Sequence, residues 1–585
     1  MDSPTPAANA SLRFRAGDFQ TLADALDYAA RGETGFNYYS VRGELKTRLP
    51  YAELRTSALD LAGRLHGLEL ERGARVALVA ETSPDFHRLF FACQYAGLIP
   101  VPMPLPMNLG GKDAYVRQIG RMMDSASASV AVASSDFIGL VREAGSERAG
   151  MLMATPEEIA ELPFRDGFVP FGPDEPCYIQ YSSGSTSAPK GVFVSQSCAV
   201  NNTRSIINHG LKIHQGDRCV SWLPLYHDMG LVGFCLTPLM SQMSVDYLGT
   251  ADFARRPLGW LRLISENRGT LSFSPPFGYD LCQRRASDSA IGEFDLSSWR
   301  VAGIGGDMVK VGVLERFAER FEASGFRRSA FVASYGLAES TLAVSFAPLD
   351  GEIETDRIDK RELARTGRTV PAAPDAPPEA TRSFVLCGRP MPGHQLEIRD
   401  DLGRTLGERE VGRILIKGPS VMEGYFENPI ATAAITTPDG WLDTGDLGYM
   451  LNGQLVVTGR SKDLIICNGR NIWPQDIEWA IERIDGIRRG DAAAFSVESP
   501  DNGEQVVTIV QCRTGDPERR ESLIREISAA VRTSTGVDCE VVLAPPRSLP
   551  LTSSGKLSRA ATKAKYLAGV FTPSPSVATS AVAES

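Results

Sequence analysis

The stretch YIQYSSGSTSAPKGV, residues 178–192, is the part of this chain that decides its fold and its chemistry. It begins as an apolar run typical of a buried strand and continues into small and hydroxyl residues before Pro189, Lys190 and Gly191. Hydroxyl groups and main-chain N–H groups in such a loop can surround phosphate oxygens, and a lysine adds positive charge. The residues predicted to bind phosphate are Ser182, Ser183, Gly184, Ser185, Thr186 and Lys190.

The loop differs from two common nucleotide-binding motifs. A Walker A loop, GxxxxGK[ST], would need a glycine where Pro189 stands, and the only near match to GxGxxG, at 303–306, fails at Met308. The alternative interpretation is a flexible Ser/Gly linker on the surface. Strand patterns on both sides of the loop disfavour that alternative, because a linker has no reason to be held between strands.

Strand and helix patterns alternate around this loop. ARVALVAE (74–81) predicts a buried strand, a helix follows it, and the alternation returns through SASVAVAS (127–134) and around residues 177–240. Such alternation predicts an α/β fold in which a large N-terminal domain holds mostly parallel sheets covered by helices. At 585 residues the chain exceeds the size of one hydrophobic core, so several subdomains are expected.

Near residue 460 the pattern changes to that of a small, separate α/β domain. DLIICNG (463–469) predicts a strand, and Pro474 opens a predicted helix. Residues 366–382 are rich in Pro, Ala and Thr and lack apolar periodicity, which predicts a surface excursion or linker. The predicted boundaries are a disordered lead over 1–15, the N-terminal domain over 16–460, the C-terminal domain over 461–565 and a flexible tail over 566–585.

The composition excludes several classes of protein. A net charge of −10 disfavours nucleic acid or an anionic membrane as the main partner, because such partners require concentrated Lys and Arg. The ten cysteines include no CxxC pair, which indicates reduced thiols. The start lacks a signal-peptide pattern, and prolines interrupt the most apolar stretch, 89–110, so no integral membrane segment is expected. These features predict a cytoplasmic protein.

Further motifs follow the loop in a fixed order. They are PLYHDMGL (224–231), GIGGDMV (303–309), SYGLAES (334–340), WLDTGDLG (441–448), VTGRSKDLI (457–465) and LPLTSSGKLSR (549–559). Over about residues 20–560 the chain thereby resembles the ANL superfamily of adenylate-forming enzymes. Within it, PPFGYDLC (275–282) and GRNIWPQDIE (469–478) make the chain most similar to the fatty acyl-AMP ligases.

The resemblance implies how ATP and Mg²⁺ bind. It places the ribose hydroxyls at Asp446 and Arg460, and Mg²⁺ on Glu339 with Thr186 as a second ligand. An ordinary alternative for Asp446 is a turn residue. The other nucleotide-binding residues that it implies are Gly305, Gly306, Asp307, Ser334, Tyr335, Gly336 and Leu337, although Tyr335 alone would be interpreted as a core aromatic.

The resemblance also implies catalytic and hinge residues. His227 lies beside the reacting carboxylate and phosphates, and Lys462 is the hinge about which the small, mobile C-terminal domain rotates. A helix cap and a solvated surface charge are the ordinary alternatives for these two residues. Lys556 is the predicted main catalytic residue, because a lysine can stabilise charge that grows on the α-phosphate as pyrophosphate departs. The implied catalytic set is Lys556, His227, Glu339 and Thr186.

The substrates implied are a fatty acid and the thiol of a separate acyl carrier protein. Residues 350–382 are extra length relative to compact CoA synthetases, and an insertion there is thought to restrict domain rotation in fatty acyl-AMP ligases. Apolar residues in PPFGYDLC, including Phe277 and Tyr279, and around VGFCLTPLM (232–240) can line an acyl tunnel, or simply belong to the core.

Three functions remain open from the sequence. They are a fatty acyl-AMP ligase, an acyl-CoA synthetase, and a non-catalytic nucleotide-binding protein on the same fold. All three predict that the phosphate loop and Asp446 line one cleft, with Lys556 on a mobile domain that can lie far from it.

Overall fold

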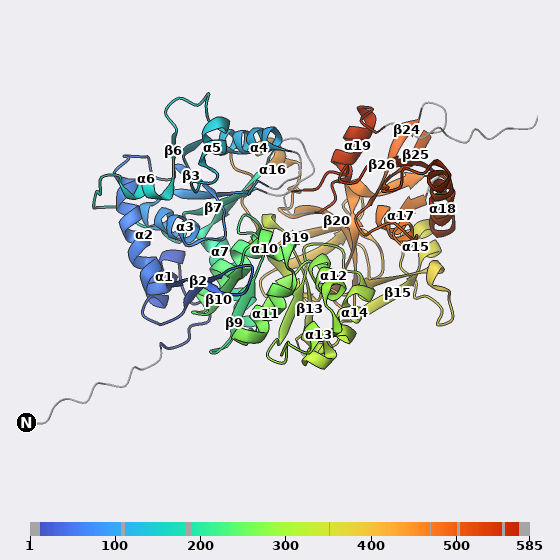
Figure 1. Ribbon diagram of the computed structural model, residues 1–585, viewed down its shortest axis with the longest axis horizontal. Coiled ribbons are helices and arrows are strands. Elements are labelled where there is room, and N and C mark those ends of the chain that lie inside the picture. Colours follow the sequence, from blue (N-terminus) through green and yellow to red (C-terminus); the bar gives the residue numbers. More distant parts are fainter. Residues whose placement is uncertain are drawn as a thin grey trace, which may run out of the picture.

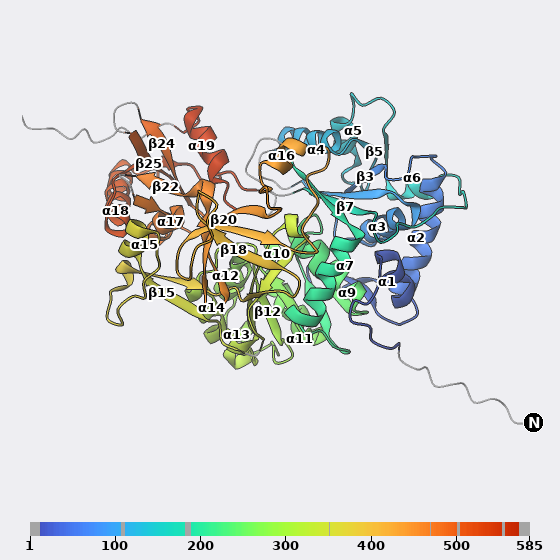
Figure 2. The ribbon, with the colours of Figure 1, turned by 180° about the vertical axis from the view of Figure 1, so that it is seen from behind.

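The computed structural model describes residues 12–106, 111–181, 189–349, 351–467, 470–499, 503–552 and 556–571. The α/β fold predicted from the sequence is confirmed: a large N-terminal part carries parallel sheets and helices, and a smaller C-terminal part lies beside it (Figure 1). Figure 2 shows from behind that the N-terminal helices α1, α2 and α3 (within residues 22–96) and the C-terminal helices α17, α18 and α19 (within residues 474–567) lie at opposite ends of the molecule. No helix in the described ranges is long and apolar enough to cross a bilayer.

The first parallel sheet has helices on both faces. In β3, Val76 and Leu78 belong to the core shared with α2 and α3, whereas Ala77 and Val79 pack with α4 and α5. A strand that is apolar on both faces is typical of a parallel sheet buried on both sides. The strands lie in the order β4 (Ile99–Met103), β3 (Arg75–Val79), β5 (Ala128–Val132) and β6 (Leu152–Ala154), with helices α2 (Tyr51–His66), α3 (Pro84–Ala96), α4 (Lys112–Ser125), α5 (Ile138–Ala144) and α6 (Pro156–Ala160).

The second sheet forms the centre of the molecule. Its strand order is β17 (Arg389–Pro390), β14 (Ala343–Phe346), β13 (Phe331–Gly336), β12 (Val301–Ile304), β11 (Leu271–Ser274), β9 (Arg218–Ser221), β10 (Ser244–Leu248), β1 (Gly35–Tyr39) and β2 (Leu45–Pro50). The inner strands, β13, β12, β11, β9, β10 and β1, pair in parallel. The strands at the two edges, β14 and β17 on one side and β2 on the other, pair antiparallel. The carboxyl ends of parallel strands are the usual place for ligands.

Helices around this sheet contain two π-helical turns. Helix α7 (Gln196–Ser205) continues into η1 (Ile206–Gly210), and α8 (Asp228–Leu231) continues through η2 (Val232–Leu236) into α9 (Thr237–Met240). Such turns are rare and often occur at functional sites. The other helical segments here are α1 (Leu22–Ala29), α10 (Thr250–Arg255), α11 (Leu258–Asn267), α12 (Pro276–Arg285), α13 (Asp288–Ile291), α14 (Val311–Phe321), η3 (Glu322–Ser324), η4 (Arg328–Ala330) and η5 (Ala338–Ser340).

Smaller β-structures complete the N-terminal part. Strands β7 (Pro176–Tyr181) and β8 (Gly191–Ser195) pair antiparallel on either side of the phosphate-loop sequence. A four-stranded sheet contains β18 (Gln395–Arg399), β19 (Gly412–Lys417), β20 (Leu442–Leu451) and β21 (Gln454–Arg460), and α16 (Pro429–Ala433) precedes β20.

The inserted segment is folded rather than an irregular excursion. Its strands β15 (Thr355–Asp359) and β16 (Thr381–Val385) pair antiparallel, with α15 (Lys360–Thr366) and η6 (Pro378–Ala380) between them. Ile358, Leu363 and Phe384 are buried in a common cluster. Residues 366–382, predicted as a surface excursion or linker, have little regular structure before β16 begins at Thr381.

The C-terminal part has a hydrophobic core of its own, built around Ile477, Val510 and Ile527. Its elements are η7 (Ser461–Asp463), β22 (Ile465–Cys467), β23 (Arg470–Ile472), α17 (Pro474–Ile481), β24 (Ala492–Ser499), β25 (Gly503–Gln511), α18 (Pro517–Thr535), β26 (Cys539–Ala544) and α19 (Arg559–Leu567).

Two predicted end segments are partly ordered. In the lead, the Arg15 N–H donates a 2.8 Å hydrogen bond to Gln242, and the Arg15 guanidinium lies over the Phe19 ring. In the tail, the Tyr566 hydroxyl donates to Glu540 and Phe571 is buried. The described residues therefore reach into both of these segments, through aromatic and arginine contacts that leave no periodic signal in the sequence.

Candidate active site

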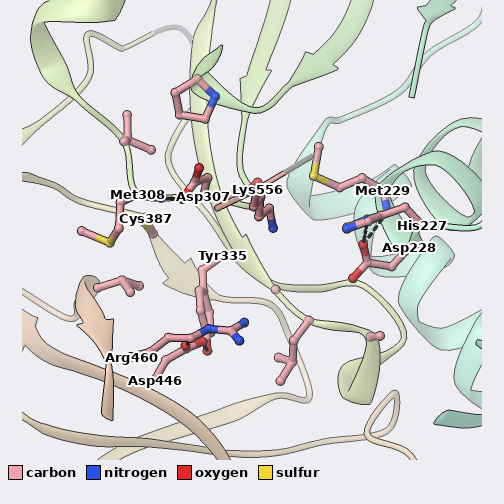
Figure 3. A pocket seen from close by; sticks show the side chains of 18 of the residues that line it. His227, Asp228, Met229, Asp307, Met308, Tyr335, Cys387, Asp446, Arg460 and Lys556 are labelled. Carbon is pink, nitrogen blue, oxygen red and sulfur yellow. Dashed lines mark hydrogen bonds and ion pairs between the residues drawn. The ribbon is translucent and has the colours of Figure 1, made fainter. Parts of the chain in front are cut away.

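A cavity of about 1120 Å³ lies between the large and small parts of the chain. Residues from every motif downstream of the phosphate loop line it, as Figure 3 shows in part. The sequence-predicted residues that line it are Lys190, His227, Gly306, Asp307, Ser334, Tyr335, Gly336, Leu337, Glu339, Asp446, Arg460, Lys462 and Lys556. Gly305 lies behind them against Ser334, and Ser182, Ser183, Gly184, Ser185 and Thr186 lie outside the described residues.

Asp446 is held at one end of the cavity by two neighbours. The Tyr335 hydroxyl donates a 2.8 Å hydrogen bond to Asp446 Oδ2, and Arg460 Nε lies 3.4 Å from Asp446 Oδ1. Burial raises the pKa of Asp446, while the positive charge of Arg460 opposes that shift. Asp446 stands in β20 opposite Arg460 rather than in a turn. Its carboxylate retains acceptor capacity for hydroxyl groups such as those of a ribose.

Glu339 lies farther along the cavity and is oriented by Tyr425. The Tyr425 hydroxyl donates a 2.7 Å hydrogen bond to Glu339 Oε1, and Lys190 Nζ lies 5.1 Å from the centroid of the Tyr425 ring. Burial raises the pKa of Glu339, so a cation beside this carboxylate would favour its charged form. Tyr425 therefore connects two residues that the motifs singled out, although no motif singled out Tyr425 itself.

The backbone at Glu339 is fixed by hydrogen bonds to a second segment of the chain, residues 420–425. Thr341 has a φ of 65°, which is unusual for a β-branched residue, and its hydroxyl donates a 2.8 Å bond to the Ser420 carbonyl. The Met422 N–H donates to the Glu339 carbonyl at 2.9 Å. These bonds hold the turn after β13 against residues 420–425, which also carry Tyr425.

His227 and Asp228 form a close pair at the start of α8. His227 Nδ1 lies 2.5 Å from Asp228 Oδ1, and the His227 ring makes no capping bond to the helix. Burial raises the pKa of Asp228, but the charges of His227 and Lys556 and a main-chain N–H group together hold it below its ordinary value. No role was predicted for Asp228 from the sequence, because the lysine that faces it comes from the other end of the chain.

Lys556 extends into the middle of the cavity. Figure 3 shows its side chain between Asp307 and the His227–Asp228 pair. Lys556 Nζ is 3.9 Å from the position that a Cβ atom would take at Gly306, where φ is +74°. The sequence allowed Lys556 to lie far from the cleft, whereas this structure has the small domain in the position that delivers it. A side chain at Gly306 would crowd the lysine.

Ion pairs hold the small domain in this position. Lys310 Nζ lies 2.7 Å from Glu482, and Arg489 lies 2.5 Å from the buried Asp280. Both pairs join helices or loops of the large part to the C-terminal part. They therefore stabilise the arrangement in which Lys556 enters the cavity.

An apolar arm of the cavity runs beneath the second sheet toward the amino ends of its strands. Leu271 and Cys219 are neighbours at the start of β11 and β9, and both line this arm. The aromatic rings of Phe234, Phe273 and Phe346 succeed one another along it. The lining residues of the apolar arm are Ile206, Leu211, Ile213, Cys219, Phe234, Thr237, Met243, Leu271, Phe273, Leu342 and Phe346.

Two glycines make room for the rings of the apolar arm. A Cβ at Gly303 would lie 2.1 Å from the Phe273 ring, and one at Gly210 would lie 2.6 Å from the Phe346 ring. Behind the lining residue Leu211, Arg300 donates to the Leu211 carbonyl at 3.1 Å and pairs with the buried Asp217 at 2.5 Å. These bonds hold the segment that carries Leu211 in place.

The expected tunnel residues are only partly those that line the arm. Phe234 and Thr237 from VGFCLTPLM do so. Tyr279 does not, because it is fully buried in an aromatic cluster and its hydroxyl donates to the Gly303 carbonyl at 2.9 Å. Phe277 is 42% exposed at the interdomain side of the cavity. The core interpretation was thus right for Tyr279.

Comparison with known proteins gives the family. The model of the AMP-binding enzyme family matches residues 30–426. The chain belongs to this family. The AMP-binding family uses ATP, and its ligases form acyl-adenylates. The resemblance to adenylate-forming enzymes is therefore confirmed, and the fold positions the motifs around one cavity.

Individual relatives cover almost the whole chain. A putative acyl-CoA synthetase of Caulobacter vibrioides is 49% identical over 98% of this chain and 99% of its own length. A medium-chain-fatty-acid–[acyl-carrier-protein] ligase of Moorena producens is 32% identical over 95% of this chain and 96% of its own. A solved structure from a study of fatty acyl-adenylate ligases from E. coli and L. pneumophila is 44% identical with a TM-score of 0.91, and covers 95% of this chain and 100% of that one.

Proposed function

We propose that the protein is a fatty acyl-AMP ligase that transfers its product to a separate acyl carrier protein. The observation that carries this proposal is a single cavity that joins the Asp446–Tyr335–Arg460 cluster to an apolar arm, with Lys556 also lining it. A nucleoside fits the first part, and an alkyl chain fits the second. The junction is where a carboxylate would meet the α-phosphate.

In the proposed reaction, an oxygen of the fatty carboxylate bonds to the α-phosphorus of ATP. The bond from that phosphorus to the bridging oxygen breaks, and pyrophosphate leaves with its electron pair. Lys556 stabilises the negative charge that grows on the phosphoryl oxygens, and Asp446 holds the ribose. Lys190 and His227 face the phosphates in this arrangement. The hydroxyl residues at 182–186, a further part of the proposal, lie outside the described residues.

The donors around Glu339 fit Mg²⁺ bound together with a nucleotide. No group of three or more His, Cys, Asp or Glu residues that could hold a metal occurs in the described ranges, so the protein alone offers no complete site. Mg²⁺ is commonly bound by one or two carboxylates plus substrate phosphates, which matches a lone buried carboxylate. Glu339 would hold the ion, and the ion would supply charge neutralisation at the phosphates.

The insertion supports a carrier protein rather than CoA as the acceptor. Buried Arg382 of β16 lies 3.1 Å from Asp476 of α17 and contacts the rings of Trp473 and Trp479. Lys360 Nζ donates to the Ser534 carbonyl at 3.1 Å. A rotation of the small domain for thioester formation with CoA would have to break these contacts. The 49% identity to a putative acyl-CoA synthetase keeps CoA as the second candidate acceptor.

Product analysis by mass spectrometry tests the proposal. The protein is incubated with ATP, Mg²⁺ and a panel of fatty acids, with and without CoA, and then with a phosphopantetheine-bearing carrier protein. We expect acyl-AMP that persists with CoA and is consumed by the carrier. Rapid conversion to acyl-CoA would instead identify a synthetase, and nucleotide binding without any acyl-AMP would identify a non-catalytic protein.

A further inference from the structure

Thr237 is the one lining residue of the apolar arm that carries a hydroxyl group. It is 1% exposed, and its Oγ1 atom has no hydrogen-bond partner in the described part of the chain. An unpaired buried hydroxyl is costly, and buried polar groups in native structures nearly always have a partner. A ligand in the arm is a natural source of that partner.

Other buried hydroxyls on nearby helices bond to their own backbone. Thr203 on α7 donates to the Ala199 carbonyl at 2.8 Å, four residues earlier, and the Ser241 hydroxyl donates in the same way to the Thr237 carbonyl. This bond is the usual solution for Ser and Thr in helices. Thr237 is therefore an exception among comparable positions.

The π-helical turn explains the exception. The Thr237 N–H bonds to the Val232 carbonyl, five residues earlier, so the carbonyl four residues earlier is out of its usual register. The carbonyl three residues earlier, at Phe234, already accepts a 2.5 Å bond from the Tyr247 hydroxyl. Neither carbonyl accepts a bond from the Thr237 hydroxyl, whose Oγ1 atom has no partner in the described part of the chain.

Two other side-chain atoms of the cavity lack partners, Gln180 Oε1 and Gln475 Oε1. Gln180 belongs to β7, which leads into the phosphate loop, and Gln475 belongs to α17 near the Arg460 side. Both lie in polar regions where a nucleotide can satisfy them. Thr237 alone faces the region proposed for the alkyl chain.

We propose that the apolar arm accommodates a fatty acid with a hydroxyl group partway along its chain, and that this group hydrogen-bonds to Thr237. The inference rests on the proposed function. Thr237 lies nine residues beyond Asp228 on the same continuous helix, which is roughly 13 Å along its axis. An extended chain advances about 3.5 Å for every three bonds, so roughly eleven bonds separate the reacting carboxyl from the hydroxyl.

The test compares one straight-chain fatty acid with three hydroxylated derivatives of it. These three are isomers of one another, with the hydroxyl group near the carboxyl, midway along the chain or at the far end. Acid-dependent ATP–pyrophosphate exchange gives kcat/KM for each. We expect the midway isomer to exceed the unsubstituted acid by about tenfold, the contribution of one net hydrogen bond. If no acid supports exchange, the proposed function fails. If the unsubstituted acid reacts and no hydroxylated isomer exceeds it, only the present inference fails.

Variants locate the effect. Thr237→Val should reduce the ratio between the midway isomer and the unsubstituted acid to about one, and Thr237→Ser should retain it. Thr203→Val is the matched control, since it removes a hydroxyl that already has a partner, and it should leave the ratio unchanged. A ratio that persists in Thr237→Val would overturn the assignment. If that variant does not fold, the ratio in the unaltered protein still decides.

Discussion

The polar and apolar ends of the cavity are built in opposite ways. At the polar end, charged side chains meet in specific pairs, such as Asp446 with Arg460 on the paired strands β20 and β21, and His227 with its neighbour Asp228. In the apolar arm, side chains from helices and strands enclose space, and no pair among them is specific apart from ring contacts. The comparison teaches that residue identity defines the polar end, whereas shape and volume define the arm.

Lys556→Ala should have the largest effect. Loss of a cation that stabilises charge in the transition state should lower kcat for acyl-AMP formation by about a hundredfold or more, with little change in ATP affinity. Single-turnover formation of acyl-AMP, measured alongside ATP binding, checks this. Lys565→Ala, an exposed lysine of α19, is the control and should behave like the unaltered protein. A loss confined to ATP affinity would contradict a catalytic role.

Asp446→Asn should raise KM for ATP by about tenfold or more, because it replaces charge-assisted hydrogen bonds with neutral ones of the same shape. KM for the fatty acid should change little if the two ends act separately. Steady-state kinetics with each substrate varied in turn gives both values. Asp401→Asn, in an exposed turn, should change neither. Equal changes in both KM values would break the comparison between the two ends.

Cys219→Phe should shift the preference toward shorter acids. The larger ring would fill part of the arm that Cys219 lines. Overpacking costs about 1–3 kcal/mol, which corresponds to a loss of up to about a hundredfold for the longest acid accepted. Cys219→Ala should act in the opposite direction by lengthening the pocket. Competition between a short and a long acid, with acyl-AMP products measured by mass spectrometry, gives the ratio. KM for ATP should stay the same in both variants.

Arg382→Gln should have the smallest effect on acyl-AMP formation, but it should measurably increase transfer of the acyl group to CoA. Removal of the buried charge breaks the contact with Asp476 and loosens the small domain. We expect acyl-CoA formation to rise severalfold while acyl-AMP formation stays within about twofold, because Arg382 lines neither end of the cavity. Arg365→Gln, on exposed α15, is the control. Unchanged acyl-CoA formation would mean that the contacts of the insertion do not restrict transfer of the acyl group to CoA.

The structure also shows why some residues were beyond the sequence analysis. Tyr425 lies in EGYFENP, which has no recognisable chemistry on its own, and it acquires a role only because Glu339 and Lys190 fold against it. Asp228 was visible beside His227, but its link to Lys556 spans more than half of the chain. Thr237 was seen only as part of an apolar run. Its unpaired hydroxyl depends on a π-helical turn that no sequence pattern indicates.

The sequence by itself determined the α/β class and the family, and it predicted many of the polar residues that line the cavity. It could do so because strand and helix periodicities are local, and because charged and glycine-rich motifs require particular residue types at particular spacings. Only the tertiary structure decided that Lys556 enters the cavity, that the insertion packs on the small domain, and that apolar side chains from η1, β9, β11 and β14 line one arm of the cavity. Those features depend on which segments meet in space, and many apolar sequences fill the same volume equally well.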